Sequence, residues 1–336
     1  MPAGKRTLSQ WVKFANSLRL RLAIRVSMSA PDLARAEVAK AMDATAGGVL
    51  ESADETVAVS TESGYKNPLG TVNEGWGEVF MGATMESVLV GYNDPRLIKY
   101  YSKAEGGDIK DEKGNLIIAE RNKIAGTYKG VPQGTGVTVK DENRYRLHSK
   151  STITKQTDAI LMTAAEVWFL RAEAALRGFT SENVKDCYEK GITVSCQQWG
   201  VNVGDYLTSD ATPSDYVDAF EAKYDVKALI KVTPKWDGGA SPEEQLERIL
   251  TQKWIACYPE GYEAWTEQRR TGYPQLFKVF VNNSGGAIDT NIRIRRLPYP
   301  SDIQKNNPTQ YSALKKALGG EDNGGTRLWW DTGRNF

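Results

Sequence analysis

Apolar residues recur every three or four positions near the start of the chain, between residues 8 and 27. They are Trp11, Ala15, Leu18, Leu22 and Val26. This spacing places them in one stripe along an amphipathic helix. Pro31 then stands at the first position of a second amphipathic helix. Because the connection between the two helices is short, we expect them to pack antiparallel as a pair over residues 8–43.

Helical periodicity returns between residues 160 and 271. Thr163 and Glu166 have the spacing of a capping box, and Gly178 marks the end of the helix that they begin. The next helix carries its aromatic residues on one face, with Gly191 beside them where another backbone can approach. An alanine-rich helix, a tight turn and a larger aromatic helix together resemble one tetratricopeptide-type hairpin.

Two further helices are expected before residue 271. Ser241, Pro242 and Glu244 combine an N-cap, an N1 proline and a capping-box glutamate. Trp254 lies on the apolar stripe of this helix, Trp265 on that of the next, and Trp168 on that of the alanine-rich helix. Residues on such stripes face the core, so core packing is expected for all three indoles. The pattern as a whole predicts a mainly α protein built from antiparallel helix pairs.

Periodicity largely disappears between residues 44 and 150, and 15 of the chain's 31 glycines fall before residue 140 of this region. Two short helices are expected inside it, separated at Asn93-Asp94-Pro95, where Asp94 can cap and Pro95 can start the second. Aromatic residues scattered through the region argue against disorder. Long irregular segments of a helical protein are commonly functional, so a binding surface is sought here.

The remaining segments are also irregular in pattern. Residues 200–240 are rich in loop-forming residues, with a short helix expected at 213–224. The tail, residues 272–336, contains the strand-like sequence IRIRRLPYP at 292–300 and a short helix near 310–318. These features predict connecting structure rather than further helix pairs.

Charge and motif content exclude several classes of protein. Lysine and arginine number 43 against 42 aspartates and glutamates, a net charge of +1, so no strong field attracts nucleic acid. A single histidine, His148, and the lack of a Cys-x-x-Cys pair predict no metal site. We expect His148 to be hydrogen-bonded or exposed rather than catalytic. The glycine-rich stretches lack phosphate-binding spacing, so no cofactor is predicted.

Glycoside hydrolysis is the enzymatic alternative, since it needs two carboxylates about 5 to 10 Å apart across a cleft. Glu260, Glu263 and Glu267 cluster in sequence. However, Glu263 and Glu267 are four residues apart on one predicted helix, which favours solvation or ion pairing with Arg270. No catalytic residue is therefore predicted.

Six stretches of the chain resemble the SusD/RagB family in the order in which they occur. They are WVKFANSLRLRLAIRV, GYNDPRL, ILMTAAEVWFLRAEAALRG, YEKGITVSCQQWGV, ILTQKWIACYPEGYEAWTEQRRTGYP and RRLPYPSDIQKNN followed by TRLWWD. The resemblance implies an α-solenoid of tetratricopeptide-like antiparallel helix pairs with a large irregular, loop-rich region. It also implies a surface-exposed lipoprotein of the outer membrane that binds nutrient glycans and delivers them to a SusC-type TonB-dependent transporter.

The resemblance further implies how the chain is organised. Members of the family usually begin with a lipoprotein signal and further helical repeats, so this chain is expected to be a C-terminal portion, with the lipid anchor outside it. We expect one SusD-like domain over residues 1–336. Its parts are a helix pair at 8–43, a loop-rich ligand region at 44–150, helical repeats at 160–271 and an irregular tail at 272–336.

Candidate site residues follow from the resemblance, because sugar-facing rings in the family come from loops that correspond here to about residues 60–150. Trp76, Tyr65 and Tyr128 are the expected stacking platforms, and Asn67, Asn73 and Tyr145 the expected hydrogen-bonding partners. Trp329 and Trp330 belong to the terminal R-x-W-W-D motif. At least one of these two indoles is expected to dock on the body of the protein rather than on sugar.

The sequence thus predicts non-catalytic binding of an oligosaccharide or polysaccharide at the cell surface and its delivery to a transporter. A protein- or peptide-binding helical scaffold is the first alternative. A glycosidase that uses Glu260 or Glu263 is the second. Which glycan is bound, or whether the nutrient is a peptide, stays open at this stage.

Overall fold

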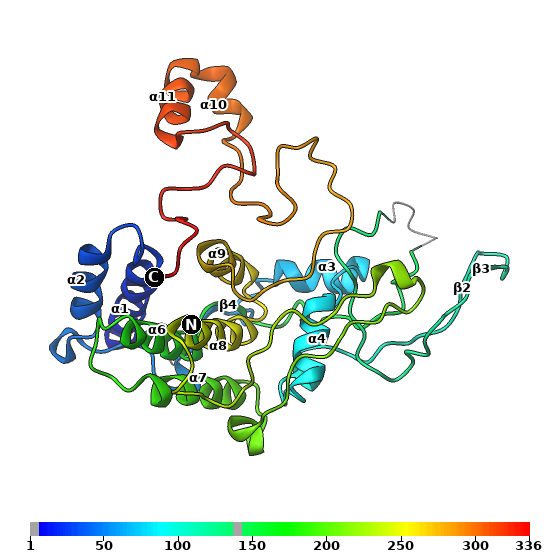
Figure 1. Cartoon of the computed structure of the whole chain (residues 1–336), viewed down its shortest axis with the longest axis horizontal. Helices are drawn as coiled ribbons and strands as arrows, with labels where there is room; N and C mark the ends of the chain where they lie inside the picture. The colour runs from blue at the N-terminus through cyan, green and yellow to red at the C-terminus, as the bar shows by residue number, and fades with distance from the viewer. Residues whose placement is uncertain (1–6, 137–142) are drawn as a thin grey trace.

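The fold is built mainly from helices, in a computed structural model that describes residues 7–136 and 143–336 (Figure 1). The helices are α1 (Leu8–Arg25), α2 (Pro31–Ala41), α3 (Pro68–Trp76), α4 (Ala83–Gly91), α5 (Leu97–Tyr100), α6 (Ala164–Leu176), α7 (Val184–Gln198), α8 (Pro242–Ala256), α9 (Gly261–Thr271), α10 (Ser301–Asn306) and α11 (Pro308–Leu318). Short 3-10 segments are η2 (Ala44–Ala46), η3 (Ala53–Glu55), η4 (Gly204–Thr208) and η5 (Ala222–Tyr224). The strands β1 (Val57–Val59), β2 (Ile109–Lys110), β3 (Leu116–Ile118) and β4 (Ala159–Met162) form two-stranded sheets. This architecture confirms the mainly α class.

Helix α6 is the centre of the helical body, where it packs against α1, α7 and α8 (Figure 1). Its alanines at 164, 165, 172 and 174 are buried, and such small side chains allow neighbouring helices to approach closely. Thr163 caps the helix by accepting a hydrogen bond from the Glu166 backbone N–H at 3.1 Å. The predicted pairing of α1 with α2 and of α6 with α7 is present. These helices form the rigid part against which the loops are held.

Gly191 of α7 faces the buried ring of Phe169 in α6, rather than a neighbouring backbone. A Cβ atom at this position would lie 2.8 Å from Phe169 Cζ. We predict that Gly191→Ala lowers the free energy of unfolding by about 1 to 3 kcal/mol through overpacking, reduced by the higher helix propensity of alanine. Urea denaturation measures the change. Gly261→Ala, where nothing lies within 4 Å of the added atom, is the control and should not destabilise the protein.

The loop-rich region contains more regular structure than its composition indicates. Strand β1 pairs antiparallel with β4, which directly precedes α6 in the sequence, so residues 57–59 and 159–162 lie side by side. Helix α3 was not expected; it begins after Asn67, whose side chain accepts a hydrogen bond from the Leu69 N–H at 3.0 Å. The two short helices around Asp94 were expected, although the second begins at Leu97 rather than at Pro95. Much of this region is therefore ordered against the helical body.

Two predictions for the remaining segments were wrong. Residues 213–224 do not form one helix, because Asp218 accepts hydrogen bonds from the backbone N–H groups of Phe220 and Glu221 and turns the chain. Only η5 is helical there, and Tyr216 forms a bridge with Val226. Residues 292–300 form no strand either; Arg293 adopts a left-handed φ of 65°, which interrupts an extended segment.

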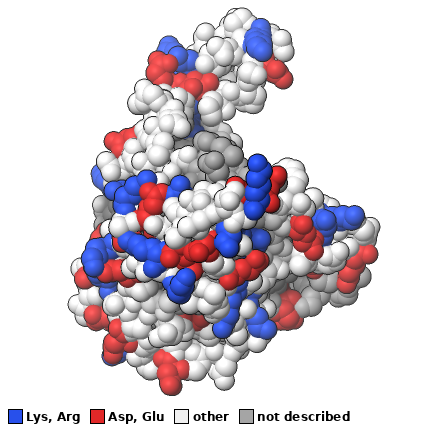
Figure 2. All heavy atoms as spheres, turned by 90° about the vertical axis from the view of Figure 1, so that its right-hand side faces the viewer, with Lys and Arg blue, Asp and Glu red and all other residues white. Residues whose placement is uncertain are grey.

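The tail leaves the body and then returns to it. Helices α10 and α11 pack on each other and project from the rest of the molecule (Figures 1 and 2). The end of the chain lies beside α1, and Trp330 lies over the guanidinium groups of Arg25 and Arg269 at 6.0 and 5.1 Å. Trp329 is 67% exposed. The expectation that one of the two indoles docks on the body is confirmed for Trp330.

Candidate ligand-binding groove

A groove of about 730 Å³ lies where the tail segment 276–294 passes over α4 and α9. Its volume falls within the roughly 300 to 1,000 Å³ typical of ligand sites. Helix α4 contributes its first turn, and α9 contributes Gly261, Ala264, Trp265 and Gln268. Trp254 enters from the last turn of α8. The groove therefore combines residues 82–133 of the loop-rich region with residues 254–294 of α8, α9 and the tail.

A narrower hollow of about 250 Å³ shares several walls with this groove. Met85, Tyr101, Trp254, Gly261 and Ala264 line both spaces, so the two adjoin each other. The additional lining residues of the hollow include the rings of Phe80 and Tyr258, together with Leu69, Ser151 and Glu260. Together the two spaces extend along α9 from the tail segment toward Leu69 in the first turn of α3.

Trp265 and Trp254 are the indoles of this groove, although their helical spacing predicted core positions. Both are half-buried. The Trp265 ring is held by two contacts: its Nε1–H donates to the Ile294 carbonyl at 3.1 Å, and the Arg269 guanidinium lies 3.6 Å from the ring centroid. Trp254 packs against the main core, the large cluster of buried side chains that includes Leu20 of α1, Leu170 of α6 and Ile255 of α8. Both apolar stripes do face the interior, but at Trp254 and Trp265 they line a groove instead of a closed core.

The polar groups of the groove are mainly amides and hydroxyls. Gln268 and Asn283 line it, and their side-chain amides make no hydrogen bond with a residue that the structure describes. Gln133 accepts a hydrogen bond from Arg293 at 2.9 Å. On the face of the molecule shown in Figure 2, Lys and Arg side chains are interspersed with Asp and Glu side chains. A neutral, multiply hydroxylated ligand finds here both flat rings and unpaired amide groups.

The expected stacking platforms lie outside these walls. Trp76, the last residue of α3, is 66% exposed, and Tyr65, on the loop before α3, is 39% exposed. Leu69 of the narrow hollow lies seven residues before Trp76, hence on the same helix face and about 10 Å away along the axis. Tyr128 is half-buried against the main core. Of the three expected platforms, Trp76 is the one that shares a helix with a lining residue of the hollow.

The expected hydrogen-bonding residues hold the loop region together instead. Asn67 is buried and donates to the Thr157 carbonyl at 3.0 Å. Asn73 donates to the carbonyls of Ser151 and Ile153 at 2.7 and 2.9 Å. Tyr145 is 3% exposed and packs against Phe220 in a small second core. The two asparagine amides already donate to backbone carbonyls, and Tyr145 is buried. The structure therefore does not bring these three residues together as a binding site beside Trp76.

Glu263 is buried among cations rather than poised for catalysis. Its carboxylate lies 2.6 Å from Arg25, 3.2 Å from Lys253 and 3.6 Å from Arg21. Burial alone would raise the pKa of this carboxyl, but Lys253 and Arg25 hold it below its usual value. Burial raises the pKa of Glu260, which caps α9 by accepting from the Glu263 N–H at 2.8 Å. These contacts give Glu263 and Glu260 structural roles.

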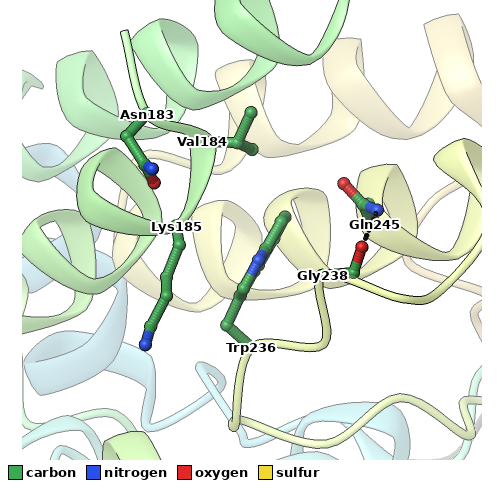
Figure 3. A pocket seen from close by; sticks show the side chains of 6 residues that line it. All are labelled: Asn183, Val184, Lys185, Trp236, Gly238 and Gln245. Carbon is green, nitrogen blue, oxygen red and sulfur yellow. Dashed lines mark hydrogen bonds between the residues drawn. The ribbon is translucent and has the colours of Figure 1, made fainter.

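A separate hollow of about 480 Å³ lies between the first turns of α7 and α8 (Figure 3). Trp236 provides its single ring, with Asn183, Val184 and Lys185 on one side and Gln245 on the other. Gln245 donates to the Gly238 carbonyl at 3.4 Å. This hollow offers one platform where the groove offers several, so the groove is the stronger candidate.

Antiparallel helix pairs that support a groove walled by loops define a helical-repeat protein. The chain belongs to the SusD-like family: the family model described as "Susd and RagB outer membrane lipoprotein" matches residues 4–331. Comparison with curated proteins gives no match. Among the described residues, no helix is both long and apolar enough to cross a membrane.

Solved SusD homologues superpose closely on the chain. One from Bacteroides vulgatus is 53% identical, with a TM-score of 0.88, and the match covers 98% of this chain and 64% of the homologue. A chitin-binding SusD homologue from Flavobacterium johnsoniae is 37% identical, with a TM-score of 0.85, covering 97% of this chain and 64% of the homologue. One from Bacteroides thetaiotaomicron is 34% identical, with a TM-score of 0.83, and the match covers 98% of this chain and 67% of the homologue. The chain thus spans about two thirds of the length of these relatives.

Proposed function

We propose that the protein binds an oligosaccharide without chemical change at the surface of the outer membrane. The observation that carries this proposal is the groove lined by Trp254, Trp265 and unpaired amides. A relative 37% identical to the chain is described as chitin-binding, which supports a glycan as the ligand class. Delivery to a SusC-type TonB-dependent transporter, with a lipid anchor holding the mature protein at the membrane, is the corresponding proposal for its cellular role.

The groove provides enough interaction energy for a carrier that must release its cargo. A dissociation constant of 100 µM corresponds to about −5.5 kcal/mol. Each well-packed ring contact contributes about 0.5 to 1.5 kcal/mol beyond the area that it buries, and each hydrogen bond about 0.5 to 1.5 kcal/mol. Two indoles and the free amides of Gln268 and Asn283 reach this range without any reactive group. Trp76 and Tyr65 are proposed as outer platforms for a longer chain.

We predict that Trp265→Ala weakens oligosaccharide binding at least tenfold, because it removes the ring that Ile294 and Arg269 hold in place. Trp265→Phe retains a smaller ring and should lose less affinity. Binding is measured by calorimetry with the tightest hit from a glycan array that includes chitin oligosaccharides. Trp236→Ala, in the separate hollow of Figure 3, is the matched control and should bind normally.

Three other results would each contradict the proposal in a different way. If Trp236→Ala abolishes binding and Trp265→Ala does not, the ligand binds in the hollow between α7 and α8 and not in the groove. If no glycan on the array binds while a transporter co-purifies with the protein, the helical-scaffold alternative is correct. Release of new reducing ends that stops in a Glu260→Gln variant would establish the glycosidase alternative.

A further inference from the structure

A pocket of about 300 Å³ adjoins the groove and is lined by arginines. It shares Gln268, Leu276 and Arg293 with the groove, so side chains of α9 and of the tail segment border both spaces. The arginines that line it are Arg269, Arg270, Arg293, Arg295 and Arg327. None of the lining residues is acidic. The electrostatic character therefore changes from neutral in the groove to positive in this pocket.

The carboxylates around the pocket neutralise only part of its charge. Arg270 is paired with Glu173 at 2.7 Å and with Glu267 at 2.6 Å. Asp331 is shared by Arg295 and Arg327. Arg269 and Arg293 have no carboxylate within 4.0 Å among residues 7–136 and 143–336. Positive charge thus exceeds negative charge at this end of the groove.

Arg269 is the most constrained of these cations. The residue is 8% exposed, donates to the Arg295 carbonyl and to Thr266 Oγ1, and has a buried Nε–H with no hydrogen-bond partner in the described chain. Burial and the neighbouring charges of Arg25 and Arg295 lower its pKa to about 10. The rings of Trp265 and Trp330 contact this guanidinium, and an anion placed nearby would stabilise it further against the charges of Arg25 and Arg295.

Arg293 connects the pocket and the groove. It is a non-glycine residue with a φ of 65°, a conformation that persists only where the surroundings impose it. Its guanidinium donates to Gln133 Oε1 at 2.9 Å, and to the backbone carbonyls of Leu276 and Phe277. The strained backbone thus holds a cation without a carboxylate partner at the boundary between the two spaces.

We propose that the bound saccharide carries an anionic substituent, which lies in the arginine-lined pocket while neutral sugar rings occupy the groove. This inference rests on the proposed function and narrows it to acidic glycans. A carboxylate of a uronic acid and a sulfate ester share the chemistry that guanidinium groups recognise through paired N–H donors. Both carry terminal oxygens that accept hydrogen bonds from guanidinium N–H groups, the kind of donor that lines this pocket.

The test compares acidic oligosaccharides with neutral partners of the same backbone. Uronate-containing oligosaccharides are paired with their carboxyl-reduced forms, and sulfated ones with their desulfated forms, on one array and by calorimetry. We expect at least tenfold tighter binding of the acidic member of one series, and a decline of that preference as NaCl is raised from 50 to 500 mM. The series that shows the preference identifies the substituent as carboxylate or sulfate.

Arg293→Gln should lower the ratio of acidic to neutral affinity at least fivefold; because Arg293 also lines the groove, any weakening common to both partners cancels in that ratio. Lys316→Gln, which removes the same charge from exposed α11, is the matched control and should retain the preference. Equal binding of acidic and neutral partners by the native protein overturns this inference and leaves the proposed function intact. A full acidic preference in Arg293→Gln, with unchanged thermal unfolding, overturns the assignment to this pocket. Absence of any glycan binding overturns the proposed function itself.

Discussion

Replacing Arg96 with methionine is expected to lower the free energy of unfolding by about 3 to 5 kcal/mol, because it leaves a buried carboxylate without its counterion. Arg96 and Asp94 are both fully buried in their side chains. The guanidinium donates to Asp94 Oδ1 at 2.9 Å and Oδ2 at 2.6 Å, and also to Ser195 at 3.0 Å and Gln252 at 2.9 Å. In the variant, the Tyr206 hydroxyl at 2.7 Å is the remaining side-chain donor to Asp94.

The measurement is urea denaturation of the native protein and of three variants. Arg121→Met is the matched control, since Arg121 forms a similar pair with Asp225 at 2.7 Å, but both side chains are about one third exposed. Exposed pairs contribute about 0 to 1 kcal/mol, so this variant should change little. The double variant Asp94→Asn with Arg96→Met should recover part of the loss, because no uncompensated charge remains. Equal losses in Arg96→Met and Arg121→Met would contradict the assignment.

The Arg96 contacts also explain how the groove keeps its shape. Arg96 follows α4, Ser195 lies in α7 and Gln252 lies in α8, two residues before Trp254. One side chain thereby ties the middle of the loop-rich region to α7 and α8 of the helical body. Because the start of α4 and the end of α8 both line the groove, we expect Arg96→Met to weaken ligand binding as well as stability.

The helices could be predicted from the sequence because their signals are local. The helix over residues 8–27 was placed within two residues of α1, and Ser241 with Glu244 forms the expected capping box at the start of α8. Proline and a capping side chain fix a helix start whatever lies around it. The hydrophobic stripe of such a helix can be buried against any apolar neighbour, so the helix can be predicted without knowing which segment packs on it.

The groove could not be predicted in the same way, because its walls are set by contacts between distant segments. A stripe shows that Trp254 and Trp265 face inward, but not that the tail at 276–294 passes over them without closing the space. Asn67 and Asn73 lie in a polar, loop-like stretch of sequence, which favoured the prediction that their side chains are free to bind sugar. Their partners, the carbonyls of Thr157, Ser151 and Ile153, lie about eighty or ninety residues away. Only the folded chain shows that these amides are already used.

His148 differs from its expected environment in a way that has consequences for stability. It is 2% exposed, packs against Tyr145 and Phe220, and neither ring nitrogen has a hydrogen-bond partner among the described residues. The prediction that it would be hydrogen-bonded or exposed was therefore wrong. Burial, with a smaller effect from the nearby Lys129 charge, lowers its pKa to about 3. A neutral imidazole is thus part of the small core that supports the loop-rich region.

We predict that this histidine makes the protein less stable as the solution is acidified below pH 6.5. Between about pH 6.5 and pH 3 the unfolded chain binds a proton on His148 and the folded chain does not, so protonation favours unfolding. The free energy of unfolding is therefore unaffected by His148 titration above pH 6.5 and decreases as the pH falls below it. At about 1.4 kcal/mol per pH unit, the loss reaches about 3 kcal/mol near pH 4.

His148→Leu, which cannot bind a proton, separates this effect from the titration of the carboxylates. Urea denaturation of both proteins from pH 8 to pH 4 gives two curves, and their difference should be flat above pH 6.5 and should favour the variant increasingly below it. Carboxylates such as Glu86, which pairs with Lys129 at 2.6 Å close to this core, contribute equally to both curves and cancel. Parallel curves across the whole range would mean that His148 binds protons alike in the folded and unfolded chain, against its burial without a partner.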